Sequence, residues 1–392
     1  MTHWTKISRG LRRPLAQLLV PLPALVLALL MLAPAAAEQR LPLDRIRLPP
    51  GFSIAVFADN VPNARSLALG RNNILFVSTM SEGKVYAVRY QGDHATQVLT
   101  LASRLNAPNG VALHDGALYV GEISRILRFD DVEAHLDDYV SRKRSPVVVT
   151  DRYPGDRHHG AKFIRFGPDG WLYVPVGAPC NICVPDAEHG LISRIRPDGS
   201  GYEVVARGVR NSVGFDWDPA TRELWFTDNG RDNLGDDLPS DELNHVTRAG
   251  QNFGYPYCHQ GDTIDPDLGR NGPPCSEFVP PVVKLGAHVA ALGASFYSGA
   301  QFPAEYHDNL FIAEHGSWNR SRKSGYRVVR VMTGAGKALD GAGAVKQEVF
   351  ADGWMENESA WGRPVDVKPM PDGSLLVSDD MAGVVYRISY QK

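Results

Sequence analysis

The apolar and polar positions of this chain recur in one pattern about every 40–70 residues. In each copy an apolar strand is followed by a turn that is often Asp-Gly. A strand of the form Leu-aromatic-Val and a strand of alternating apolar residues come next. The six copies cover residues 64–90, 108–130, 159–199, 210–250, 291–332 and 363–389. Repeated antiparallel units of this length are typical of propellers, whose blades bury their faces against one another. The pattern predicts an all-β fold, a six-bladed β-propeller with four-stranded antiparallel blades.

Two segments outside the repeats complete the predicted architecture. Residues 51–58 form a spare strand, which we expect to pair with the last blade and close the ring. Residues 130–145 are expected to contain a short surface helix. A β-sandwich is the alternative architecture, but it does not explain six copies of one motif.

The first 37 residues have the pattern of a secretory signal peptide. A basic region precedes an apolar stretch over residues 15–33, and three alanines at 35–37 offer a cleavage site. We therefore expect residues 38–392 to form a single propeller domain that is periplasmic or secreted. A retained membrane anchor is the alternative. After cleavage we expect no stable membrane insertion, since no later stretch is long and apolar enough to span a bilayer.

The four cysteines are interpreted in the light of this export. In an oxidising compartment an even number suggests two disulfides, and we prefer Cys180–Cys183 and Cys258–Cys275 among the three possible pairings. A zinc site is the alternative, but the second pair lacks the ligand spacing that it needs. Val184 follows the Cys-x-x-Cys pair where a haem attachment motif has histidine, so any electrons must pass to an external acceptor.

The residues before the first strand of each repeat indicate the chemistry of the site, because they lie at the mouth of the central channel. They are polar or basic in every copy: Arg65, Asn109, His159, Arg210, Asn211, His288 and Arg363. Arginine binds carboxylates with paired hydrogen bonds, and histidine is suited to accept a proton near neutral pH. The set favours a polyanionic ligand beside a base, although each residue alone is as consistent with a solvated loop.

Charge and carboxylate content add two expectations. The 392 residues include 41 basic and 44 acidic ones, with a formal net charge of −3. Since nucleic-acid binding generally requires a basic excess, we expect no nucleic-acid partner. Residues 227–244 form an oxygen-rich turn of a kind that suits calcium, and an ordinary acidic turn is the alternative.

The ordered motifs resemble those of one known family. They are His159-Gly160 leading into Gly167-Pro168-Asp169-Gly170, the turn Gly208-Val209-Arg210-Asn211, and Asp228-Asn229-Gly230-Arg231 followed by Asn252-Phe253-Gly254-Tyr255-Pro256. Over residues 45–390 the chain resembles the quinoprotein glucose/sorbosone dehydrogenases, in particular their sorbosone dehydrogenase-like and aldose sugar dehydrogenase branch. The resemblance implies a soluble six-bladed propeller that uses pyrroloquinoline quinone (PQQ) and calcium.

The resemblance also implies roles for individual residues. His159 is implied to be the general base, with Arg210 near the quinone oxygens and Asn211 near the cofactor ring. The backbone carbonyls of Gly230 and Arg231 are implied to hold calcium.

Further positions match the family less closely. Arg363 is implied to pair with a cofactor carboxylate. A cofactor-binding lysine of the family's glucose enzymes is replaced, so Arg320 or Lys323 would have to take its place. Those enzymes also have an acid that supports the base, whereas here Gly177 is followed by Ala178, so the base needs another orienting group or less help.

Together these features predict an oxidoreductase that oxidises aldose sugars or sorbosone-like sugar aldehydes. His159 would take the hydroxyl proton while hydride passes to PQQ, with calcium polarising the quinone and Arg210 stabilising the developing charge. The alternatives are a calcium-dependent lactonase on the same type of propeller and a non-catalytic propeller that binds a protein or glycan. The basic channel mouth argues against the first, and the intact set of site residues argues against the second.

Overall fold

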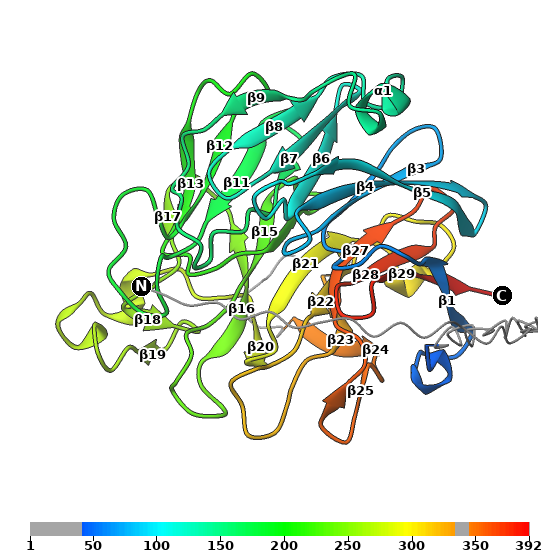
Figure 1. The fold of residues 1–392 in the computed structure, drawn as a ribbon. Helices are drawn as coiled ribbons and strands as arrows, with labels where there is room; N and C mark the ends of the chain where they lie inside the picture. Colours follow the sequence, from blue (N-terminus) through cyan, green and yellow to red (C-terminus); the bar gives the residue numbers. More distant parts are fainter. Residues whose placement is uncertain (1–40, 334–344, 392) are drawn as a thin grey trace, which may run out of the picture. The chain divides into compact units, whose positions relative to one another are not determined.

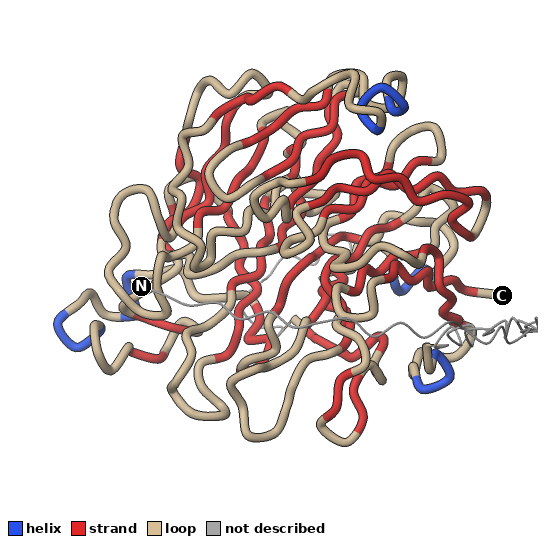
Figure 2. The backbone as a smooth tube through the Cα atoms, viewed as in Figure 1, coloured by secondary structure: helices blue, strands red, loops and turns tan. Residues whose placement is uncertain are grey.

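The six repeats form six blades, as the sequence predicts. The computed structural model describes residues 41–333 and 345–391, and most of its regular structure is strand (Figures 1 and 2). Within these ranges six sheets each contain four antiparallel strands, and the third gains one short parallel strand at its edge. The predicted signal peptide, residues 1–37, lies outside the described residues.

Each blade is described from its innermost strand outwards. The first blade consists of β2 (Leu67–Leu69), β3 (Ile74–Ser78), β4 (Lys84–Gln91) and β5 (His94–Ser103). The second consists of β6 (Gly110–His114), β7 (Ala117–Gly121), β8 (Ile126–Phe129) and β9 (Val147–Thr150). The third consists of β10 (Arg165–Phe166), β11 (Leu172–Val176), β12 (Leu191–Ile195) and β13 (Glu203–Arg207), with β17 (Gln251–Asn252) at the edge. The fourth blade consists of β14 (Gly214–Trp217), β15 (Leu224–Asp228), β16 (Ser240–Val246) and β20 (Val283–Ala287). The fifth consists of β21 (Ala291–Phe296), β22 (Leu310–Glu314), β23 (Arg327–Met332) and β24 (Lys346–Ala351). The sixth consists of β27 (Pro364–Pro369), β28 (Leu375–Asp379), β29 (Val384–Tyr390) and β1 (Phe52–Ala58).

The remaining elements are short. They are α1 (Leu136–Val140), the 3-10 turns η1 (Leu43–Arg45), η2 (Gly269–Asn271), η3 (Cys275–Glu277) and η4 (Ala304–Tyr306), and the hairpins β18 (Cys258–His259)–β19 (Thr263–Ile264) and β25 (Met355–Glu356)–β26 (Ser359–Ala360). Helix α1 confirms the short helix expected within residues 130–145. Among the described residues, no helix has the length and apolar character needed to cross a bilayer.

The ring closes as expected. Strand β1 pairs antiparallel with β29, from Phe52 opposite Tyr390 to Ala58 opposite Val385, and the two lie side by side in Figure 1. The outer strand of the last blade thus comes from the N-terminal side of the described chain. Closure of this kind leaves no open junction between the first and last blades.

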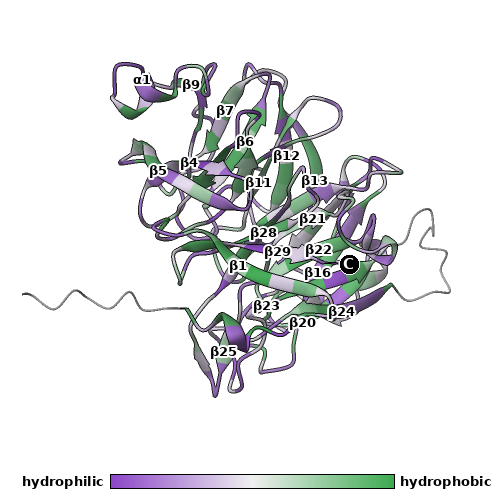
Figure 3. Cartoon of the chain, turned by 90° about the vertical axis from the view of Figure 1, so that its right-hand side faces the viewer, coloured by the Kyte–Doolittle hydropathy of each residue, from purple (hydrophilic) through white to green (hydrophobic). Residues whose placement is uncertain are grey.

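The core is divided among the junctions between blades. The alternation within β3 shows how: Leu75 and Val77 pack in the hydrophobic cluster shared with the sixth blade, whereas Ile74 and Phe76 pack in the cluster shared with the second. Six such clusters lie in the described residues, one at each junction. Figure 3 shows apolar residues concentrated on the strands and polar residues on the loops. Because successive side chains of a strand point to opposite faces of the sheet, every blade has two apolar faces, and each face is buried against a neighbouring blade.

The innermost strands bring distant parts of the chain together. Strand β2 adjoins both β6 and β27, and β21 adjoins both β14 and β27. Because neighbouring strands of a blade are antiparallel, the start of an innermost strand lies beside the end of the next strand outwards, as Gly214 lies opposite Thr227. One face of the ring therefore collects the residues before each first strand and those after each second strand.

Candidate active site

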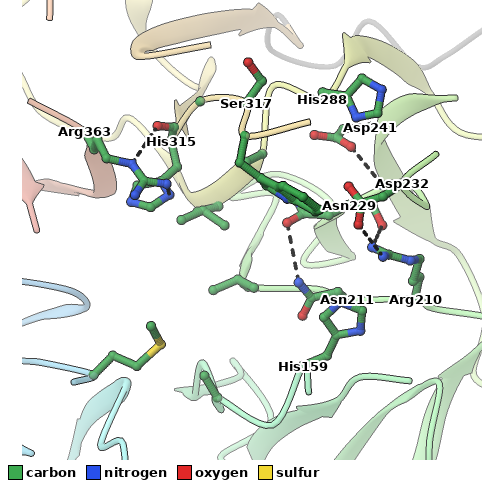
Figure 4. Close-up of a pocket in the computed structure, with 18 of the residues that line it drawn as sticks. His159, Arg210, Asn211, Asn229, Asp232, Asp241, His288, His315, Ser317 and Arg363 are labelled. Carbon is green, nitrogen blue, oxygen red and sulfur yellow. Dashed lines mark hydrogen bonds and ion pairs between the residues drawn. The ribbon is translucent and has the colours of Figure 1, made fainter. Parts of the chain in front are cut away.

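That face contains a cavity of about 340 Å³, within the usual range for small-molecule sites. The residues predicted for the channel mouth that line it are Arg65, His159, Arg210, Asn211, His288 and Arg363. Asn109 is not among the lining residues, but its Oδ1 accepts a hydrogen bond of 2.8 Å from Arg65 Nε. In Figure 4, Arg363 and His315 lie on the opposite side of the cavity from Arg210 and Asp232.

His159 is held in an unusual backbone conformation. Its φ of 50° lies in the left-handed region, which is uncommon for residues other than glycine and tends to occur at functional sites. The backbone can approach because residue 177 is glycine: a Cβ there would lie 2.5 Å from His159 Cβ and 2.8 Å from its carbonyl oxygen. Gly177 is therefore required for the position of His159.

The imidazole of His159 has a defined tautomer. Its Nδ1 lies 2.9 Å from the carbonyl oxygen of Ala178, and a carbonyl can only accept, so Nδ1 carries the proton and Nε2 has a free lone pair. Burial, followed by the charge of Arg210 and by His158, lowers the pKa of His159 to about 3, so the ring is neutral. No acidic residue follows Gly177 to orient His159, and the backbone carbonyl of Ala178 orients the ring instead.

Arg210 is fixed by four acceptors. Its Nε donates to the carbonyl of Asn181 at 2.9 Å, its Nη1 to the carbonyl of Asn229 at 3.1 Å, and its Nη2 to Asn181 Oδ1 at 2.8 Å and to Asp232 Oδ2 at 3.3 Å. The side chain is buried, and burial lowers its pKa. Arg210 lies at the cavity with its charge already paired to Asp232.

The predicted disulfides are both present, and one supports this arginine. Cys180 is bonded to Cys183 and Cys258 to Cys275. Asn181, which accepts twice from Arg210, lies inside the first loop. The same loop is bonded to the adjacent insertion, since the backbone N–H of Cys183 donates to the Tyr255 hydroxyl at 3.2 Å.

Buried carboxylates hold the backbone around the cavity. Asp228 accepts from the N–H groups of Arg210 and Asn211, at 2.8 and 2.6 Å. Asp241, which lines the cavity, accepts from Gly230 N–H at 2.8 Å and Ala291 N–H at 3.3 Å. Burial raises the pKa of Asp228 to about 7 and that of Asp241 to about 6. Their acceptor oxygens fix the loops that hold the site residues.

The predicted calcium-binding carbonyls belong to two differently placed residues. Gly230 lines the cavity, whereas Arg231 is not among the lining residues. The Arg231 side chain points to the disulfide-linked insertion, where Nη1 donates to Asp265 Oδ2 at 2.6 Å and Asp267 Oδ2 at 2.9 Å. Among the described residues, no group of three or more His, Cys, Asp or Glu side chains could hold a metal ion.

The structure does not bring Arg320 or Lys323 to the cavity. The guanidinium of Arg320 donates to the Asp236 carbonyl and to Asp237 Oδ1, both at 2.9 Å, and Lys323 Nζ donates to the Glu358 carbonyl at 2.6 Å. Arg320 therefore joins two loops at the rim rather than facing the ligand space.

The other side of the cavity contains a chain of polar contacts. Arg363 Nη2 lies 2.7 Å from His315 Nδ1, and His315 Nε2 lies 2.9 Å from Asp380 Oδ1. Asp380 Oδ2 in turn accepts from Arg65 Nη1 at 2.9 Å, and Arg65 Nε donates to Asn109. His315 is buried, and burial lowers its pKa to about 4 in spite of Asp380.

Sequence reasoning missed several residues of the site. It placed Asp232 only within the oxygen-rich turn 227–244 and not as the partner of Arg210, and it identified none of Asn181, His315 and Asp380. It also missed Trp318, which lines the cavity with 77% of its surface exposed. His315 lies directly after β22 and Asp380 directly after β28, whereas Trp318 is the fourth residue after β22. Residues that follow the second strand of a blade lie on the same face of the ring as the channel mouth, and this rule could have identified His315 and Asp380 from the sequence.

Comparison with known proteins agrees with this architecture. Fold and site define a six-bladed propeller with a basic cavity at one end of its channel. The chain belongs to the TrAA12-like family, whose model matches residues 46–391. An uncharacterized protein of Borreliella burgdorferi is 31% identical over 357 residues, covering 88% of this chain and 91% of the relative.

Two solved structures show the same fold at low identity. A Trichoderma reesei enzyme of carbohydrate-active enzymes family AA12, in its calcium structure, has a TM-score of 0.75 at 18% identity and covers 91% of this chain and 100% of its own. The holo form of the PQQ domain of Coprinopsis cinerea pyranose dehydrogenase has a TM-score of 0.71 at 18% identity and covers 88% of this chain and 97% of its own. The resemblance to quinoprotein sugar dehydrogenases is confirmed at the level of the fold.

Proposed function

We propose that the protein is a PQQ- and calcium-dependent dehydrogenase of aldose sugars or sorbosone-like sugar aldehydes, acting in the periplasm or outside the cell. The observation that supports this most is the placement of His159. Its imidazole is neutral with a fixed Nδ1–H, which leaves Nε2 with a lone pair, and the residue lines a cavity that several arginines also line. A base beside a site for anionic groups is what hydroxyl oxidation with an acidic cofactor requires.

The residues of the cavity fit a ligand with several carboxylates. Three arginines that precede innermost strands line it. Arg65 is paired with Asp380 and Arg210 with Asp232, whereas Arg363 has no carboxylate partner among the described residues. Arg363 therefore has charge and donors available for an anionic group. The holo structure of the PQQ domain of pyranose dehydrogenase supports this choice of ligand.

The same wall of the cavity offers oxygen atoms to calcium. Asp232, Asp241 and the Gly230 backbone line it, and carboxylate and carbonyl oxygens are the ligands that calcium prefers. We propose that the Gly230 and Arg231 carbonyls hold part of this ion, with the bound cofactor supplying further oxygens. When bound, PQQ supplies a two-electron acceptor and calcium a Lewis acid beside it.

In this proposal His159 removes the hydroxyl proton at Nε2. Its Nδ1–H bond to Ala178 keeps the ring oriented while Nε2 accepts the proton. Part of the lowering of the His159 pKa comes from Arg210, so an anion bound beside both residues offsets that charge and raises the basicity of the ring. Arg210 lies ready to donate to the same anion, because its position is fixed by Asn181 and Asp232.

The substrate side of the cavity suits a sugar. Trp318 presents an exposed indole, whose face can pack against the C–H groups of a pyranose ring, while Ser317 and His288 supply polar contacts. An external acceptor then takes the electrons.

The test uses residues 38–392 with added PQQ and calcium, following dye reduction with a panel of aldoses and sorbosone. His159→Ala should lower kcat by at least about 10²-fold. The matched variant is His158→Ala, since the His158 ring lies 4.1 Å from that of His159 but is not among the lining residues; it should retain activity. No dye reduction, together with no quinone-induced rise in Tm, would disprove the proposal, and lactone hydrolysis without quinone would replace it.

A further inference from the structure

His315 connects the two arginines on one side of the cavity. Its Nδ1 faces Arg363 Nη2 at 2.7 Å and its Nε2 faces both oxygens of Asp380, at 2.9 and 3.0 Å. Asp380 also forms the ion pair with Arg65, and both side chains of that pair are less than 10% exposed. Arg363 and His315 lie next to each other at the edge of the cavity in Figure 4.

The hydrogen-bond donors and acceptors around His315 determine which of its ring nitrogens carries the proton. A guanidinium can only donate, so His315 Nδ1 must be the acceptor and carry no proton. The proton is then on Nε2, where it is donated to the Asp380 carboxylate, which can only accept when ionised. All the bonds are satisfied by a neutral Nε2–H imidazole, the opposite tautomer to that of His159.

This arrangement leaves Arg363 and Arg65 in different electrostatic states. Asp380 pairs directly with Arg65, whereas Arg363 donates to two uncharged acceptors, His315 Nδ1 and, at 3.5 Å, the His315 carbonyl oxygen, and has no carboxylate in direct contact among the described residues. A carboxylate in the place of His315 would orient Arg363 equally well but would also neutralise it, and would then compete with an anionic ligand.

We propose that His315 is a positioning residue, which orients Arg363 through Nδ1 so that an unpaired guanidinium faces an anionic group of the ligand. This inference rests on the proposed function for the identity of the ligand, PQQ. In this inference His315 affects how tightly the anion binds, whereas His159 takes part in the proton transfer.

Two substitutions separate the two contacts of His315. Asparagine places an amide oxygen near the position of Nδ1 and so keeps the acceptor for Arg363, but it does not reach Asp380. Glutamine places its amide nitrogen near the position of Nε2 and so keeps the donor to Asp380, but it presents no acceptor at Nδ1. We expect His315→Gln to raise the Kd for PQQ about tenfold, in parallel with Arg363→Ala, and His315→Asn to remain close to the wild type.

The experiment combines quinone titration in the presence of calcium, followed by absorbance, with nitrogen NMR of the histidine rings and a Tm for each variant. The expected NMR result for the wild type is a His315 with a protonated Nε2 and an unprotonated Nδ1 whose resonance shifts in Arg363→Ala. Equal loss of affinity in the Asn and Gln variants, or an Nδ1–H tautomer, would overturn the inference. If the wild type binds no PQQ, the proposed function fails, and the NMR result alone decides whether His315 orients Arg363.

Discussion

Replacing Gly177 with alanine should displace His159 while the propeller stays folded. The new Cβ would lie 2.5 Å from His159 Cβ and 2.8 Å from its carbonyl oxygen, where ordinary contact begins at 3.4 Å. Residues 159 and 177 must therefore separate by about 0.9 Å to restore ordinary contact between the two Cβ atoms. The φ of Gly177 is outside the left-handed region, so alanine can adopt the backbone, and the effect comes from the contacts of the new Cβ with His159 and, at 3.2 Å, with the Arg210 carbonyl oxygen.

The expected consequence is larger for catalysis than for folding. A base misplaced by about 1 Å can lower the rate about 10²-fold, because the near-attack geometry is lost. Overpacking typically costs about 1–3 kcal/mol of stability. The hydrogen bond of 2.9 Å from His159 Nδ1 to the Ala178 carbonyl would also lengthen, so the tautomer would no longer be fixed.

The assay is kcat for dye reduction at saturating PQQ, calcium and sugar, with Tm measured on the same samples. Gly155→Ala is the matched control, since a Cβ at Gly155 meets nothing within 4 Å and its φ is also outside the left-handed region; it should behave as wild type. An unchanged kcat in Gly177→Ala, or an equal loss in both variants, would refute the reasoning.

Three further outcomes are expected. Trp318→Ala should raise KM severalfold with an unchanged Tm, because the indole is 77% exposed at the cavity; a changed Tm would point to a structural role instead. Arg231→Ala removes the arginine partner of buried Asp265, which keeps its contact with His259 Nε2, and should lower the free energy of unfolding by about 1–3 kcal/mol, measured by urea denaturation. Finally, the pKa of His159 is lowered from 6.5 to about 3 by burial and by Arg210, so below pH 6.5 the unfolded state binds a proton that the folded state does not. Stability should fall as the pH drops from 7 to 5, and His159→Ala should make that fall shallower in denaturation measured at both pH values.

Much of the fold follows from local patterns. In the strand Ile74–Ser78 the four apolar residues 74–77 pack alternately in two different clusters. A run of four consecutive apolar residues in a strand thus already indicates that both faces of the sheet are covered. The count of such repeats gives the number of blades, and the spare strand at Phe52–Ala58 gives the closure. These features depend on near neighbours in sequence and on periodicity, which is why they could be predicted.

The candidate site could be predicted only in part. The position before each innermost strand is defined by the repeat, and it correctly placed His159, Arg210 and Arg363 at one cavity. The partners of these residues are set by the fold alone: Asp380 pairs with Arg65 across 315 positions of the sequence. The group that orients His159 is a backbone carbonyl, which every residue possesses, so no residue type could have indicated it.

The loops between strands were the weakest part of the sequence interpretation, and Arg320 shows why. Residues next to a strand have a direction fixed by the strand, whereas residues several positions into a loop point where the loop contacts allow. Arg320 is six residues beyond the end of β22 and reaches Asp236 and Asp237 on another loop instead of the cavity. His315, one residue beyond the same strand, lines the cavity.

The pairing of charges explains how a site rich in arginine can remain folded and still favour an anion. Arg210 and Arg65 are compensated by Asp232 and Asp380, so their burial costs less than that of free charges. The buried Asp228 does not compete for the ligand space, because its oxygens accept from backbone N–H groups. Of the three arginines before innermost strands, Arg363 alone is oriented by neutral groups with no carboxylate partner among the described residues. The ring of blades thus tolerates a cluster of positive charge by neutralising two of these three arginines. In the proposed function the third, together with the exposed Arg157 that also lines the cavity, is available to the anionic group of the ligand.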